Sequence, residues 1–232
     1  MNPRFLAVAK DPAIIPAVHH YCDEWCDYCA VTRRCLAFRC MAEWRKQRGR
    51  SPADPPFASM NEAARFTREL AAAEGMRTDE LDRLLANPAD LSDRTTDPLA
   101  STAWEYAVRV AVIMMPVAGA IAVLEPKPAG PAPEEIVLWC HLRIYMSVFQ
   151  ALVSAERRLS TGKGEDDALG CAKRTIVMAA RSRRALHAMR TEDRAAEIDA
   201  LMALLGALEH GIDERFPGAR SFVRFGLDLP VG

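Results

Sequence analysis

Alternation of polar and apolar residues, the pattern of a half-buried β-strand, is almost absent from this sequence. The chain therefore lacks the strands that a sheet or a β/α barrel requires. Apolar residues recur instead at intervals of three and four from Ala13 onward, which predicts an all-α fold. The predicted helices cover 13–29, 31–48, 59–74, 78–87, 98–124, 133–160, 165–190 and 192–216. The last four are long and joined by short connections, which predicts an antiparallel helical bundle.

Segments rich in proline and glycine interrupt this helical pattern at 49–56 and 125–133, and a smaller break lies at 161–164. They predict three parts: a Cys-rich metal-binding helical segment at 1–58, connecting helices at 59–96, and the helical bundle with a C-terminal tail at 97–232. Asp97 directly before Pro98 predicts an N-cap followed by proline at the first position of a helix.

A secretory signal is also lacking, because the first ten residues contain no basic segment followed by a long apolar run. We therefore expect a cytoplasmic protein. One span, 107–124, is nearly free of charge but contains Arg109, Pro116 and Gly119. Its borderline length and its charge favour the central helix of a soluble bundle over a membrane span. We expect no membrane partner and no second span of this kind.

The seven cysteines do not form the pattern of a disulfide framework, since their number is odd and five of them lie between Cys22 and Cys40. In a reducing compartment, clustered cysteines are typical of thiolate metal ligands, whereas isolated ones in apolar stretches are small core residues. The second description applies to Cys140 and Cys171. The sequence thus predicts a metal centre near the N-terminus.

The predicted ligands of this centre are Cys22, Cys26, Cys29 and Cys35. On one continuous helix the first three sulfur atoms would fall within roughly 60° of each other, because each residue advances the helix by about 100°. A turn after Cys29 would then have to return Cys35 as the fourth ligand, which leaves Cys40 as a spare or core residue.

Four thiolates can hold either a tetrahedral zinc ion or an iron–sulfur cluster. Zinc sites more often use two Cys-x-x-Cys pairs separated by a longer loop, whereas this chain has one compact run. The spacing therefore departs from the common zinc pattern, and our leading hypothesis is a 4Fe-4S cluster with a redox or redox-sensing role. Zinc stays open as the alternative, in which the metal would only stabilise a helical protein-interaction module.

The run Cys26-x2-Cys29-x5-Cys35, followed by Leu36-Ala37-Phe38, resembles the cluster segment of the WhiB-like iron–sulfur regulators. The same spacing is similar to the iron–sulfur loop of the helix-hairpin-helix DNA glycosylases. Both resemblances imply that these three cysteines bind a 4Fe-4S cluster in a helical protein. The chain departs from both families because its first cysteine lies four positions before the second, and it lacks the Gly-Trp-Gly turn of the WhiB-like proteins. DNA or sigma-factor binding is therefore not implied.

Two further resemblances add no function. The motif Phe-Pro-Gly-Ala-Arg-Ser-Phe-Val-Arg at 216–224, together with the Cys-rich start, resembles a group of all-helical bacterial proteins whose function is not known. The spacing Cys22-x3-Cys26-x2-Cys29 is similar to the cluster motif of radical S-adenosylmethionine enzymes. That chemistry belongs to a β/α barrel, and Cys35 would close the iron position that such enzymes leave open.

The net charge of the chain is −1, but the segment 33–50 is strongly basic. It contains seven basic residues and only one acidic residue, Glu43. Such a segment forms a solvated or internally paired face, or docks an anionic protein or nucleic acid. The basic residues are Arg33, Arg34, Arg39, Arg45, Lys46, Arg48 and Arg50.

Motifs for a di-iron centre are lacking, because none of the five histidines follows an acidic residue by three positions. A further alternative is an enzyme with a pocket in the helical bundle, and the sequence identifies no substrate for it. Its candidate lining residues are His141, Arg143, Lys173 and Arg181. His19 and His20 lie close enough to the cysteines to support or replace a ligand, or they lie on a helix surface.

Overall fold

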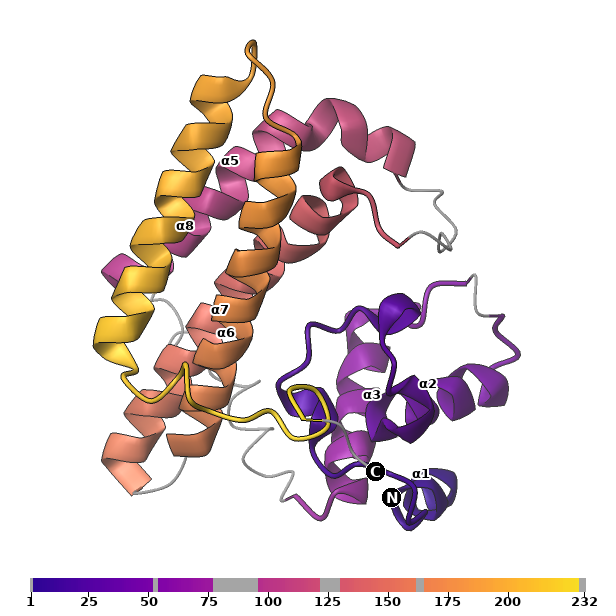
Figure 1. The fold of residues 1–232 in the computed structure, drawn as a ribbon. Coiled ribbons are helices and arrows are strands. Elements are labelled where there is room, and N and C mark those ends of the chain that lie inside the picture. The colour runs from indigo at the N-terminus through magenta and orange to yellow at the C-terminus, as the bar shows by residue number, and fades with distance from the viewer. Residues whose placement is uncertain (1, 52–53, 77–95, 122–129, 162–164, 230–232) are drawn as a thin grey trace. The chain divides into compact units, whose positions relative to one another are not determined.

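The fold is all-α, as the periodicity predicts, in a computed structural model that describes residues 2–51, 54–76, 96–121, 130–161 and 165–229. Within those residues every regular element is an α-helix or a 3-10 turn, and pairing between extended residues is limited to one isolated bridge, Phe225 with Leu229. Contacts divide the chain into two compact units (Figure 1). The first contains Met1–His20, Cys29–Leu91 and Arg224–Gly232, and the second contains Tyr21–Tyr28 and Ser92–Val223. These limits differ from the predicted boundaries at 58 and 96.

Three α-helices form the first unit: α1 (Pro3–Ala9), α2 (Leu36–Gln47) and α3 (Met60–Ala73). Their shared core is aromatic, because the fully buried Trp44 ring lies 5.4 Å from Phe66 and 6.3 Å from Phe5, centroid to centroid. α3 begins with a capping residue, since the Ser59 hydroxyl accepts a hydrogen bond from the Glu62 N–H at 3.2 Å. This cap and core fix the direction of α3 and so place the residue at its C-terminal end, Glu74.

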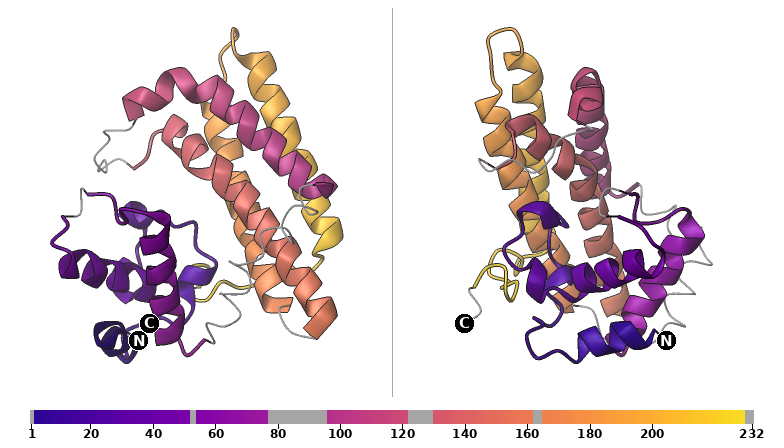
Figure 2. Two further views of the ribbon diagram at one scale, coloured as in Figure 1. Left: turned by 180° about the vertical axis from the view of Figure 1, so that it is seen from behind. Right: turned by 90° about the vertical axis from the view of Figure 1, so that its right-hand side faces the viewer.

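Four long helices form the second unit: α5 (Pro98–Ile121), α6 (Pro133–Thr161), α7 (Glu165–Ala188) and α8 (Ala195–Arg215). α6 packs against α5 and α7, and α8 packs against the same two helices (Figure 2). Their apolar faces close over one core. The predicted cap at the start of α5 is confirmed, because the Asp97 carboxylate accepts a hydrogen bond from the Leu99 N–H at 2.8 Å.

The prediction of a helix at 13–29 was wrong. This stretch and the residues that follow it form three short 3-10 turns instead: η1 (Val18–His20), η2 (Cys26–Tyr28) and η3 (Thr32–Arg34). Ala17 and Glu24 adopt positive φ values of 55° and 59°, which interrupt a right-handed helix at two points. The cysteines therefore do not share the edge of one helix.

Other differences concern a helix at the N-terminus and an apolar helix in the second unit. α1 was missed, although Asn2 caps it and Pro3 occupies its first position. The predicted helix at 78–87 lies outside the described residues. The expectation of a single apolar span at 107–124 was also wrong: Pro133–Glu156 in α6 is long and apolar enough to cross a membrane, and 39% of its most apolar stretch is buried. Because core helices pass the same test, this one helix is weak evidence for a membrane.

Candidate functional site

None of the seven cysteines, all of which lie in the described part of the chain, forms a disulfide. Cys140 and Cys171 lie in the core of the second unit, which confirms their predicted role as small core residues. Cys40 is likewise buried, in the aromatic core of the first unit. Burial raises the pKa of the Cys40 thiol to about 12, and the nearby charge of Glu74 acts in the same direction. Cys40 is therefore an inert core thiol.

The four predicted ligands lie in a segment of turns that passes from one unit to the other. Cys22 and Cys26 belong to the second unit, and Cys29 and Cys35 belong to the first. The first three are partly exposed and only Cys35 is buried. Their assignment as ligands of one metal centre stays a prediction from the sequence.

Cys35 is the residue that precedes α2, and its side chain packs with Ile15 and Val18. Burial raises the pKa of the Cys35 thiol, and the nearby Cys29 and Glu74 raise it further. Two backbone N–H groups at the start of α2 lower this pKa but do not cancel the increase. The metal-free thiol is therefore protonated at neutral pH, so a metal that binds here must displace a proton.

Cys22 lines a cavity of about 300 Å³ in the second unit. Two arginines face this cavity. Burial lowers the pKa of Arg143, while the charges of Glu24, Cys22 and Cys26 oppose that shift. The cavity is lined by Cys22, Asp23, Glu24, Leu142, Arg143, Met146, Gln150, Arg174 and Met178.

An aromatic stack holds the segment that contains Cys22 and Cys26 in the second unit. The Trp25 ring lies 5.1 Å from the ring of Trp139 on α6, with 12° between their planes. The Trp139 indole N–H donates a hydrogen bond to the Asp23 carbonyl at 2.9 Å. On the same ring, the Arg143 guanidinium carbon lies 3.7 Å from the centroid, within the range of a cation–π contact. Trp25 is therefore a packing residue here.

Arg174 on α7 also contacts the backbone at Cys22. It is buried, and it donates hydrogen bonds to Ser147 Oγ at 2.8 Å, to Gln150 Oε1 and to the Cys22 carbonyl at 3.5 Å. Charge-assisted hydrogen bonds of this kind are stronger than neutral ones. The backbone at Cys22, a residue that lines the cavity, is thus held by α7.

Of the four residues predicted to line a pocket, only Arg143 does so. His141 contacts the Leu138 carbonyl on its own helix at 2.6 Å, and burial lowers its pKa. Lys173 donates to the Arg220 carbonyl at 2.6 Å, and Arg181 pairs with Asp23. His141, Lys173 and Arg181 are thus not among the residues that line this cavity, and their place in a pocket stays a prediction.

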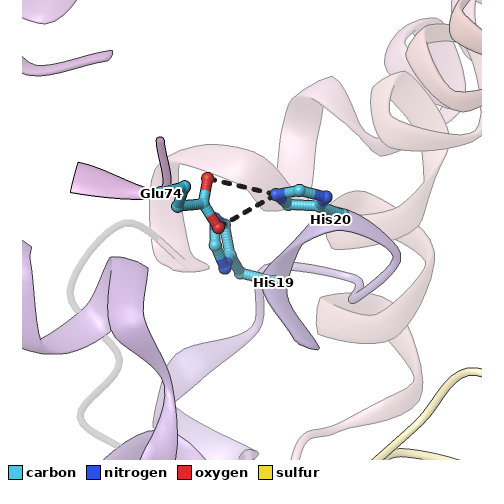
Figure 3. Close-up of side chains that lie close together, drawn as sticks. All are labelled: His19, His20 and Glu74. Atoms are coloured by element: carbon cyan, nitrogen blue, oxygen red, sulfur yellow. Dashed lines mark hydrogen bonds and ion pairs between the residues drawn. The ribbon is translucent and has the colours of Figure 1, made fainter. Parts of the chain in front are cut away.

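His19 and His20 do not lie on a helix surface. The turn η1 directs both imidazoles to the carboxylate of Glu74, the residue that ends α3 (Figure 3). Glu74 Oε1 lies 3.4 Å from His19 Nε2 and 3.2 Å from His20 Nε2. The two rings meet edge to face with centroids 4.6 Å apart. One donor atom from each of the three residues lies within 4.8 Å of the others.

Electrostatics around Glu74 favour its ionised form. Burial opposes ionisation, but hydrogen bonds and charge from His19 and His20 prevail and lower its pKa to about 2. The carboxylate is therefore a charged acceptor at neutral pH. Sequence reasoning missed Glu74, because it is far from the histidines along the chain and no local motif marks it.

The basic segment is partly neutralised within the first unit. Arg39 pairs with Asp11 at 2.6 Å, and Glu62 accepts both Arg48 at 2.5 Å and Arg50 at 2.9 Å. Internal pairing, one of the two expected uses of this segment, thus applies to three of its arginines.

Comparison of the chain with protein-family models, with curated proteins and with solved structures finds no match.

Proposed function

We propose that Cys22, Cys26, Cys29 and Cys35 bind a 4Fe-4S cluster and that this cytoplasmic protein transfers electrons or senses oxidants. The observation that supports the proposal is the concentration of four cysteines, none of them in a disulfide, between positions 22 and 35, in a segment of turns and not of regular helix. The donor set suits the group, because iron–sulfur clusters are held by four cysteine thiolates. When bound, the cluster would accept and release single electrons.

The chain's own residues would tune such a cluster in two ways. Arg143 places positive charge close to Cys22 and Cys26, which favours the more reduced, more negative state of a cluster. Cys22, Cys26 and Cys29 are partly exposed, so solvent reaches these three residues. Access of this kind is what an oxidant sensor requires.

Purification without oxygen, followed by analysis of iron, acid-labile sulfide and zinc, tests the proposal. We expect about four iron and four sulfide per chain, with visible absorption that bleaches on reduction by dithionite. Stoichiometric zinc without sulfide would instead identify the zinc-stabilised interaction module and reject the cluster.

Substitution of Cys35 by alanine tests the ligand assignment. Cys35→Ala should abolish iron and sulfide binding, whereas Cys40→Ala and Cys140→Ala should leave both unchanged. All three side chains are buried, so each substitution creates a comparable small cavity at a cost of about 1 kcal/mol. Equal loss of iron in all three variants would show that stability, and not ligation, controls the metal content.

A further inference from the structure

We propose that His19, His20 and Glu74 form a second metal site, suited to zinc and independent of the cysteine centre. The first unit supplies all three side chains, two from η1 and one from the end of α3. Two imidazoles and one carboxylate are a donor set found in catalytic zinc sites, which keep a further coordination position for water or a substrate.

The distances between the donor atoms are compatible with zinc. Ligand atoms bound to one tetrahedral zinc at about 2.0–2.1 Å lie roughly 3.3 Å from each other. Glu74 Oε1 lies 3.4 Å from His19 Nε2 and 3.2 Å from His20 Nε2. A zinc ion could therefore bind these atoms with little movement of the side chains.

The convergence of two adjacent histidines is unusual for a 3-10 turn. Such a turn has three residues per revolution, so neighbouring side chains point about 120° apart. Here both rings nevertheless reach the same carboxylate oxygen (Figure 3). Ala17, directly before this turn, has a φ of 55°, a left-handed conformation that is unfavourable for a residue with a Cβ atom. Strain of this kind is often retained where a site requires a particular backbone path.

The surroundings also suit a cation. The side chains of His19 and Glu74 are only 13% and 14% exposed, so little water screens the carboxylate charge, while His20 is 31% exposed and leaves the site open on one side. The competing explanation is that the two histidines only form hydrogen bonds with Glu74, because the same distances fit imidazole–carboxylate hydrogen bonds. The two explanations differ in whether zinc binds.

The test uses the full chain, purified without oxygen so that its cysteine centre stays loaded, and zinc ion alone as the probe. We expect one zinc per chain, bound to nitrogen and oxygen at about 2.0–2.1 Å in X-ray absorption spectra, with the signature of imidazole. A zinc shell made only of sulfur, at about 2.3 Å, would place the metal on cysteines and overturn the proposal. This measurement requires no variant.

The Glu74→Gln variant keeps the shape of the side chain but removes its charge. Zinc affinity should fall by at least about 100-fold, since changes outside the ligand shell already cost 10–100-fold. His210→Ala is the matched control, because His210 and Glu214 form an exposed pair at 3.3 Å that the described residues do not complete with a third donor. Wild-type zinc affinity in Glu74→Gln would show that His19, His20 and Glu74 are joined only by hydrogen bonds and do not bind zinc.

Iron and sulfide content separates this site from the proposed cluster. Glu74→Gln should keep the iron and sulfide of the wild type, and Cys35→Ala should keep the zinc bound to nitrogen and oxygen. Loss of that zinc in Cys35→Ala, with its helix content intact, would contradict the independence of the two sites.

Discussion

Replacement of Gly170 by alanine should destabilise the second unit and disturb the cysteine segment. Gly170 lies on α7, where a Cβ atom would stand 2.4 Å from two ring carbons of Tyr21. Tyr21 cannot easily move away, because its hydroxyl donates to Asp167 at 2.8 Å and its ring packs edge to face on Phe222. Ordinary contacts of this kind are 3.4–4 Å long. The ring must therefore shift by about 1 Å, together with the backbone that leads to Cys22.

The magnitude follows from two opposing effects. Alanine in place of glycine within a helix stabilises a protein by about 1 kcal/mol. Insertion of a methyl group into a packed contact costs about 1–3 kcal/mol. The net change at Gly170 should thus range from zero to a loss of about 2 kcal/mol. Gly206 on α8 is the matched control, because its Cβ would meet nothing within 4 Å, and Gly206→Ala should gain about 1 kcal/mol.

Urea unfolding of both variants measures the difference directly. In a Tyr21→Ala background the obstructing ring is gone. There Gly170→Ala should raise the free energy of unfolding by about 1 kcal/mol, whereas in the wild-type background it should not raise it. Iron content should fall in Gly170→Ala and stay unchanged in Gly206→Ala. If Gly170→Ala is as stable as Gly206→Ala, the close packing of Tyr21 on α7 is refuted.

Two further predictions concern charge in the first unit. The N–H of Ala58 and the guanidinium groups of Arg50 and Arg48 lower the pKa of Glu62 from 4.5 to about 2. Because this pKa is depressed on folding, the carboxylate contributes stability that is complete above pH 4.5 and is lost as the pH falls toward 2. Thermal unfolding of Glu62→Gln across this window should be less sensitive to pH than that of the wild type, and equal slopes would contradict the assignment. If the basic segment docks a nucleic acid, affinity for single- or double-stranded probes should fall steeply with salt and should weaken in Arg45→Gln/Lys46→Gln; salt-independent binding would exclude such docking.

The helices that could be predicted are those in which local signals agree. α3 and α5 to α8 show the three- and four-residue spacing over many turns, and Asp97 marks the start of α5 with a cap that the structure confirms. Residues 13–29 contain a similar spacing, but left-handed backbone at Ala17 and Glu24 breaks the helix. Neither residue type favours that conformation, so composition gave no warning.

The two candidate sites differ in how far they could be predicted. Cysteines that are close in sequence mark the first site, which stays a prediction from their spacing. The second depends on Glu74, which reaches the histidines only because the packing of α3 in the first unit brings its end to η1. A tertiary contact of this kind leaves no periodicity or motif in one sequence. The sequence alone therefore could not decide whether His19 and His20 belong to a site or lie on a helix surface.

The chemistry of the donors determines the order in which the two sites should be loaded. Thiolates are soft ligands that select iron–sulfur clusters but also bind zinc tightly, whereas imidazole and carboxylate bind zinc without supporting a cluster. If the cysteines are left without a cluster, added zinc should reach them as well, and zinc would exceed one per chain. If the cluster is in place, only nitrogen and oxygen donors remain open to zinc. Excess zinc in protein prepared in air, decreasing to one per chain as iron and sulfide are restored, is therefore the pattern that two independent sites require.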